Sequence, residues 1–142
     1  MTKFSDLKLD PNVLKAIAEA GYDAPTPIQA GAIPPALDGR DVLGIAQTGT
    51  GKTASFTLPM ITLLGRGRAR ARMPRSLVLC PTRELADQVG KQLRKLATGI
   101  PNLKLMILTG GTPLGPQLAS HGPIIDVAIA LLLVGAVTKS AD

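Results

Sequence analysis

The hydrophobic positions of this chain alternate between strand-like and helix-like spacing. Apolar runs at residues 41–45, 76–80 and 104–108 each predict a short buried strand. Helical spacing follows the first two runs, over residues 53–64 and 84–98. Strands that alternate with helices predict an α/β fold, in which a parallel sheet is flanked by helices and covered on both faces.

Two more helices are predicted ahead of the first strand. The Asp-Pro pair at residues 10–11 combines a capping side chain with proline at the first helical position, and Gly21 ends the helix. A Thr-Pro pair at residues 26–27 repeats this signal. The second helix is expected to be interrupted at the prolines of residues 34–35, because proline removes a helical hydrogen bond, and to end by Gly39.

The sequence AQTGTGKT, residues 46–53, lies between the first strand and its helix. A strand, a glycine loop and a helix, in this order, form the context that a phosphate-binding loop needs. Gly49 and Gly51 allow backbone N–H groups to converge on a phosphate at the positive end of the helix. Lys52 would reach the β and γ phosphates of a nucleotide, and the Thr53 hydroxyl would ligate Mg²⁺.

One position departs from the general phosphate-loop pattern, because Ala46 stands where the strict form has glycine. A Gly/Thr-rich turn that binds nothing is the simpler alternative. The strand pattern before the loop and the helix pattern after it favour nucleotide binding.

Composition limits what else the chain can be. The hydrophobic fraction is 45% and the aromatic fraction only 2%, so the core of this 142-residue chain must be aliphatic. A net charge of +6 permits an anionic partner such as nucleic acid, but a solvated basic surface explains the charge as well. Residues 65–75 hold five arginines and are interpreted as an exposed, solvated connection, with contact to RNA phosphates as the alternative.

The one cysteine and the one histidine of the chain argue against a disulfide framework and a metal cluster. Cys80 is the one cysteine and lies in an apolar run, so it is expected to be a buried, inert thiol without a disulfide partner. His121 has no Cys or His neighbour with which to build a metal site and is expected in a loop.

The N-terminus lacks a charged segment followed by an apolar one, so the cytoplasm is the expected compartment. Residues 124–137 are too short to span a membrane and contain Asp126.

Three further positions have side chains or backbone suited to binding. The amide of Gln29 has a donor and an acceptor side by side, as adenine has on its N6/N7 edge, although Gln29 alone is an ordinary polar helix residue. Arg83 follows the second strand and would project at the carboxyl end of the sheet, where ligands of open α/β folds bind. The Thr-Gly-Gly sequence at residues 109–111 would let backbone amides approach a phosphate.

Four ordered motifs resemble those of the DEAD-box ATP-dependent RNA helicases, the bacterial group in particular. GYDAPTPIQ at residues 21–29 is similar to the Q motif of that family, and Phe4 stands seventeen residues earlier, where the family has an isolated aromatic. Residues 46–53 resemble motif I, in which alanine is the usual first residue. PTRELA at residues 81–86 resembles motif Ia, and residues 110–111 resemble the glycine pair that follows it.

The resemblance implies an incomplete RecA-like P-loop NTPase domain that binds ATP and Mg²⁺. Phe4 would stack on adenine, Gln29 would hydrogen-bond its edge, and Lys52 and Thr53 would be the catalytic residues, with Thr53 on the metal. The full nucleotide site implied by the family contains Phe4, Tyr22, Gln29, Gln47, Thr48, Gly49, Thr50, Gly51, Lys52 and Thr53. The RNA backbone, rather than its bases, would be bound by Pro81, Thr82, Arg83, Gly110 and Gly111.

The resemblance ends near the C-terminus. Residues 126–130 are similar to the next strand of the family, but Leu-Leu-Leu-Val at residues 131–134 replaces Thr-Pro-Gly-Arg. No Asp-Glu-Ala-Asp occurs, because Glu-Leu-Ala-Asp at residues 84–87 belongs to motif Ia. The expected organisation is a Q-motif region (1–39), a partial RecA-like ATP-binding domain (40–130) and an aberrant tail (131–142).

These departures predict that the chain alone has no RNA-stimulated ATPase or unwinding activity. Three interpretations follow from the sequence. The chain is a helicase gene product truncated by a frameshift, a deletion or an assembly error; or it is a non-catalytic fragment that binds nucleotide or RNA; or it does not fold alone.

Overall fold

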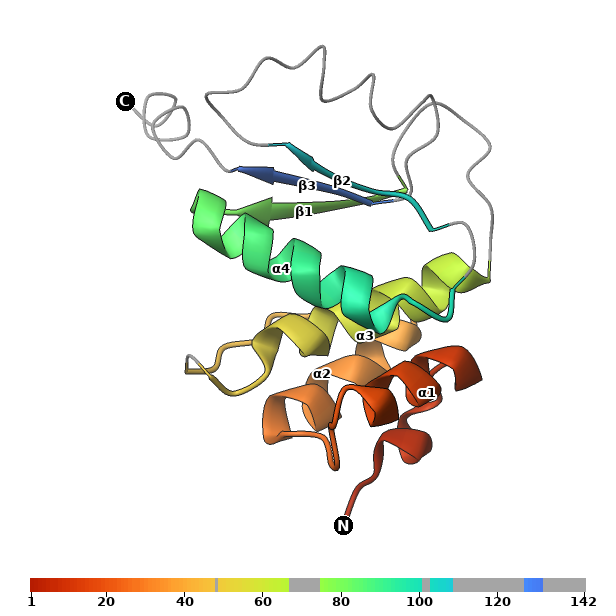
Figure 1. Ribbon diagram of the computed structural model, residues 1–142. Helices are drawn as coiled ribbons and strands as arrows, with labels where there is room; N and C mark the ends of the chain where they lie inside the picture. Colours follow the sequence, from red (N-terminus) through yellow and green to blue (C-terminus); the bar gives the residue numbers. More distant parts are fainter. Residues whose placement is uncertain (48, 67–74, 101–102, 109–126, 132–142) are drawn as a thin grey trace. The chain divides into compact units, whose positions relative to one another are not determined.

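The computed structural model describes residues 1–47, 49–66, 75–100, 103–108 and 127–131. These residues form two compact units. The first unit contains η1, α1, α2, α3 and the end of α4 from Gln92, and the second contains β1, α4 up to Lys91, β2 and β3. The elements in chain order (Figure 1) are η1 (Phe4–Leu7), α1 (Pro11–Glu19), α2 (Pro27–Leu37), α3 (Lys52–Gly65), β1 (Ser76–Cys80), α4 (Arg83–Leu96), β2 (Leu105–Leu108) and β3 (Val127–Leu131).

The first α-helix begins and ends as the sequence predicts. The Asp10 carboxylate accepts a hydrogen bond of 2.8 Å from the N–H of Asn12, which satisfies one of the free donors of the first turn. At the other end, Gly21 has a φ of 82°, and the N–H of Tyr22 donates to the carbonyl of Ile17 at 3.1 Å. This pattern is a glycine-terminated helix end, and it fixes where Tyr22 leaves the helix.

The predicted interruption of the second helix is wrong. Helix α2 runs without a break from Pro27 to Leu37 and contains the prolines of residues 34–35. The φ of proline suits a helix, but each proline loses the hydrogen bond that its missing N–H cannot make, and its ring crowds the carbonyl four residues earlier. Packing of α2 along α3 offsets that loss, and Gly39, with a φ of 78°, ends the helix as expected.

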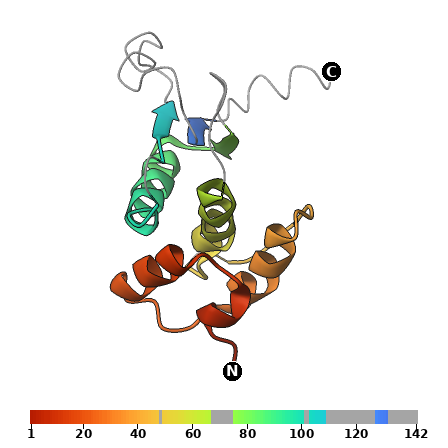
Figure 2. The same ribbon diagram turned by 90° about the vertical axis from the view of Figure 1, so that its right-hand side faces the viewer.

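The core of the first unit is aliphatic, as the composition predicts. Helices α2 and α3 pack against each other, α1 contacts α3, and η1 lies beside α2 (Figure 2). The buried apolar side chains of this unit are Phe4, Leu7, Leu9, Val13, Ala16, Ile17, Ala32, Ile33, Ala54, Leu58, Ile61, Leu93, Leu96 and Ile100.

The second unit is built on a parallel sheet of three strands in the order β1-β3-β2 (Figure 1). Val127 of β3 pairs with Ser76 of β1 on one side and with Leu105 of β2 on the other. The predicted parallel arrangement is therefore confirmed. The side chains of Leu77 and Leu79 are more than half exposed, so the expectation that both faces are covered is not met at β1.

The strand predicted at residues 41–45 is wrong. This segment has no regular secondary structure, and the side chains of Leu43 and Ile45 are 90% and 86% exposed. An apolar run becomes a strand only when neighbouring strands accept and donate its backbone hydrogen bonds, and within the described residues none pairs with it. The segment passes close to α2 instead. The distance at Gly44 shows this, since a Cβ there would lie 3.2 Å from Cδ1 of Ile28.

The different environments of two leucines give a direct test of this fold. Leu58 of α3 is fully buried, so Leu58→Ala should lower the free energy of unfolding by about 2–5 kcal/mol, through lost burial and a new cavity. The same change at exposed Leu43 should stay within about 0.5 kcal/mol. Urea unfolding of both variants measures the difference. If Leu43→Ala lowered the free energy of unfolding as much as Leu58→Ala, residues 41–45 would be buried as the sequence predicts, and the exposed segment described above would be wrong.

Candidate nucleotide-binding site

The loop between the exposed apolar segment and α3 has the backbone of a phosphate-binding turn. Gly49 and Gly51 have φ values of 83° and 82°, in the left-handed region that residues with a Cβ rarely adopt. Between them, the hydroxyl of Thr50 donates to the carbonyl of Gln47 at 2.5 Å. The glycines therefore provide the tight turn that the sequence predicts.

Helix α3 presents its N-terminus to this loop without a capping side chain. Gly51 is its N-cap residue and has no side chain with which to satisfy the first N–H groups. Lys52 and Thr53 occupy the first turn, with Lys52 exposed. The combination of uncapped N–H groups, the helix dipole and an ammonium group suits an anion such as a phosphate.

Gln29 fastens this loop to helix α2. Its Oε1 accepts from the N–H of Thr26 at 3.0 Å, and its Nε2 donates to the carbonyl of Gly51 at 3.1 Å. The residue is only 5% exposed. The structure thus brings together two positions that the sequence singled out separately, Gln29 and the glycine loop, and gives Gln29 a mechanical role in holding the loop.

Close approach makes glycine essential at position 51. A Cβ there would lie 2.3 Å from Nε2 of Gln29 and 3.4 Å from Oγ1 of Thr26. The Thr26 hydroxyl is buried and, within the described part of the chain, has no hydrogen-bond partner. A buried polar atom next to the loop is a group that a polar ligand or its water shell would satisfy. Thr26 was predicted only as a helix cap, and its proximity to Gly51 depends on tertiary structure.

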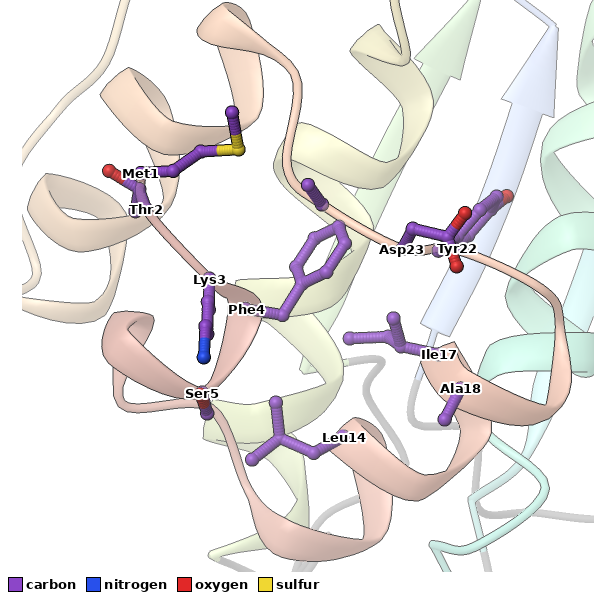
Figure 3. A pocket seen from close by; sticks show the side chains of 11 residues that line it. Met1, Thr2, Lys3, Phe4, Ser5, Leu14, Ile17, Ala18, Tyr22 and Asp23 are labelled. Atoms are coloured by element: carbon purple, nitrogen blue, oxygen red, sulfur yellow. The ribbon is translucent and has the colours of Figure 1, made fainter.

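A pocket of about 470 Å³ in the first unit is lined by two aromatic side chains, Phe4 and Tyr22 (Figure 3). Phe4 from η1, Leu14 and Ile17 from α1 and Tyr22 after α1 are among its walls. The rings of Phe4 and Tyr22 have centroids 6.5 Å apart at an interplanar angle of 35°. This volume lies within the range of small-molecule sites, about 300–1,000 Å³. The full lining is Met1, Thr2, Lys3, Phe4, Ser5, Leu14, Ile17, Ala18, Tyr22, Asp23 and Ala24.

Two of the predicted nucleotide residues therefore share a pocket, and others share the loop. Gln29 does not line the pocket, and Thr48 lies outside the described residues. A residue that the sequence did not single out also contacts this region. The side-chain amide of Gln92 donates to the hydroxyl of Tyr22 at 2.9 Å. No motif or spacing marks Gln92, because it lies 70 positions from its partner.

The residues predicted to bind RNA are accessible where the structure describes them. Pro81, Thr82 and Arg83 are all exposed at the end of β1 and the start of α4. The hydroxyl of Thr82 accepts from the N–H of Leu85 at 3.2 Å, so Thr82 caps α4 as expected. The predicted glycine pair, residues 110–111, lies outside the described residues.

The described residues offer neither a reactive thiol nor a cluster of metal ligands. Cys80 is buried as predicted, and its burial raises the pKa of the thiol, which keeps it protonated and unreactive at neutral pH. No cluster of three His, Cys, Asp or Glu side chains suited to a metal occurs in the described ranges. Nor does any helix described here have the length and apolar character needed to cross a membrane.

Comparison with known proteins gives consistent matches. The family model "DEAD/DEAH box helicase" matches residues 26–135. The chain is 53% identical over 112 residues to ATP-dependent RNA helicase SrmB of Escherichia coli (strain K12), covering 78% of this chain and 25% of the relative. It is 48% identical over 131 residues to ATP-dependent RNA helicase DbpA of the same organism, covering 90% and 28%.

A solved structure extends the similarity to the fold. The RNA-helicase Prp28 from Chaetomium thermophilum, bound to ADP, superimposes with a TM-score of 0.81 at 34% sequence identity. The match covers 98% of this chain and 34% of that one. The chain thus spans about a quarter of the length of the two curated relatives named above.

Paired glycine substitutions separate the two constraints on the loop. Gly49→Ala introduces a side chain at positive φ with nothing within 4 Å, so it should cost about 1–2 kcal/mol of unfolding free energy. Gly51→Ala has the same φ but displaces Gln29 and its two hydrogen bonds, so it should cost about 2–4 kcal/mol. Urea unfolding measures both, and equal costs would show that Gln29 does not restrain the loop.

Proposed function

Because the chain belongs to the DEAD/DEAH box helicase family, we propose that it is part of an ATP-dependent RNA helicase and binds ATP with Mg²⁺. The observation that supports this proposal most strongly is the loop at Gly51. Its left-handed φ, its contact with Gln29 and the uncapped N-terminus of α3 support the binding of a phosphate at this turn.

The phosphates of the nucleotide would lie at the start of α3. Lys52 would neutralise the β and γ phosphates, and the Thr53 hydroxyl would be the protein ligand of Mg²⁺. Gly49, where a Cβ would meet nothing within 4 Å, would leave space for phosphate oxygens at the backbone, and Gln47, Thr48 and Thr50 are the other nucleotide contacts that we propose in this loop. A metal held by one hydroxyl, phosphate oxygens and waters is typical of Mg²⁺ sites in nucleotide-binding proteins.

The adenine base would enter the pocket beside Phe4 and Tyr22. The pocket volume of about 470 Å³ and its mainly apolar walls support binding of a flat ring. Gln29 does not line this pocket, so the edge of the base would have to extend beyond the pocket to reach it. Each side of the Gln29 amide has used one hydrogen bond, which leaves one N–H and one lone pair for that edge. Gln29 would then have two tasks, holding the loop and selecting adenine.

RNA would be bound through its backbone at the start of α4. Pro81, Thr82 and Arg83 are exposed there, and a guanidinium at a helix N-terminus suits a phosphate contact without reading bases. Gly110 and Gly111 would add backbone donors, as the family resemblance implies. The net charge of +6 supports an anionic partner. We place this activity in the cytoplasm, where bacterial RNA and ATP occur together.

Base selectivity separates the two tasks proposed for Gln29. ADP and GDP labelled with a fluorescent methylanthraniloyl group should bind with different Kd values, the ADP form more tightly. Gln29→Ala should weaken both and remove the difference, because the amide that matches the adenine edge is lost. Fluorescence titration measures all four constants. If Gln29→Ala weakened binding of both nucleotides equally and kept the preference for ADP, Gln29 would only hold the loop and would not select adenine.

Lys52→Ala serves as the control for phosphate binding. It should weaken both labelled nucleotides by about tenfold or more, without changing their ratio, since charge-assisted hydrogen bonds to phosphate are lost. Circular dichroism checks that the variant is folded. Labelled nucleotide that binds Lys52→Ala as well as the original chain would refute the proposed site.

The 142-residue chain is expected to bind without turnover, because its sequence contains no Asp-Glu-Ala-Asp to hold the metal and the attacking water. Phosphoryl transfer depends on positioning and on stabilising the charge of the transferred group, so loss of these carboxylates should abolish turnover. Phosphate release should therefore match the Lys52→Ala variant with and without RNA. Any excess over that variant would show that the chain is an active ATPase.

A further inference from the structure

The position of Tyr22 is determined at both of its ends. At the backbone, the N–H of Gly21 donates to the carbonyl of Ala18 and that of Tyr22 donates to the carbonyl of Ile17, both at 3.1 Å. This double contact ends α1, and Tyr22 follows it as a lining residue of the pocket that Phe4 also lines (Figure 3). At the far end of the ring, the hydroxyl accepts a hydrogen bond from Gln92 at 2.9 Å.

Gln92 is well placed to hold that hydroxyl. It lies on α4 next to Leu93, which is completely buried, and Leu96, one turn later, is buried as well. The stretch of α4 around Gln92 is therefore anchored by apolar packing, and the amide extends from a fixed backbone. Gln92 itself is half-buried, so its contact with Tyr22 is partly shielded from competing water.

We propose that Gln92 is a positioning residue for the base pocket, which keeps the Tyr22 ring in place beside Phe4. The inference rests on the proposed nucleotide function, since it assigns the pocket to the base. The aromatic wall gains its shape from two fixed points, the helix end at Gly21 and the amide of Gln92. With the amide removed, the half-buried hydroxyl loses its partner and the ring gains rotational freedom.

Purely structural support is the competing explanation, in which Gln92 only ties the turn after α1 to α4. The two explanations differ in which part of a nucleotide is affected. A loss of general stability would weaken binding of base and phosphates alike. A pocket that loses one fixed wall would weaken binding of the base and leave binding of inorganic phosphate chains unchanged.

The test uses the 142-residue chain with Gln92→Leu, Tyr22→Phe and both changes together. The labelled ADP should bind about threefold to tenfold more weakly to each single variant, the value of one neutral hydrogen bond. The double variant should be no weaker than either single variant, because both remove the same contact. Gln88→Leu is the matched control, since Gln88 is exposed on the same helix, and it should bind like the original chain.

Binding of inorganic tripolyphosphate distinguishes a positioning role from a merely structural one, because tripolyphosphate has phosphates but no base. Its displacement of labelled ADP should give the same inhibition constant for the original chain and for Gln92→Leu. Tyr22 is the one tyrosine and the chain has no tryptophan, so its fluorescence anisotropy reports this ring alone. The anisotropy should fall in Gln92→Leu and stay unchanged in Gln88→Leu.

Distinct outcomes overturn the inference and the proposed function. Unchanged ADP binding by Gln92→Leu, or a parallel loss of ADP and tripolyphosphate, would refute a positioning role while leaving nucleotide binding intact. Failure of the original chain to bind labelled ADP would refute the proposed function, and the inference with it.

Discussion

The hydrogen bond between Gln29 and the carbonyl of Gly51 is the contact on which the candidate site depends. It joins the start of α2 to the start of α3 across 22 positions of the sequence, at a point where no Cβ fits. Gly51 has a left-handed backbone conformation, is the N-cap residue of α3 and is the hydrogen-bond partner of Gln29. A single residue type, glycine, satisfies all three conditions at position 51.

The aromatic pocket is built on a different principle. Its walls come from η1, from α1 and from the turn that follows α1, and the contact with Gln92 adds support from α4. The loop is shaped by glycine, whereas the pocket is shaped by two aromatic rings in a chain that has only three aromatic residues. Phe4 and Tyr22 are two of these three, which is consistent with a specialised use of aromatic surface in an otherwise aliphatic protein.

The apolar segment at residues 41–45 shows why periodicity alone does not make a strand. Leu43 and Ile45 have side chains typical of buried strands, yet they are almost fully exposed. Residues 76–80 have a comparable pattern and do form β1, because β3 supplies their backbone partners. The difference between the two runs lies in the pairing available to them and not in their own composition.

Local signals in the sequence determined most helix ends and the turn of the phosphate loop. Asp10, Gly21 and Gly39 act on backbone groups within a few residues, so their effects can be read from the sequence. The family resemblance likewise followed from ordered motifs. Tertiary structure alone decided that α2 continues through its prolines, that Gln29 holds Gly51 and that Gln92 meets Tyr22. Each of these depends on contacts between segments distant in sequence, which spacing along the chain does not encode.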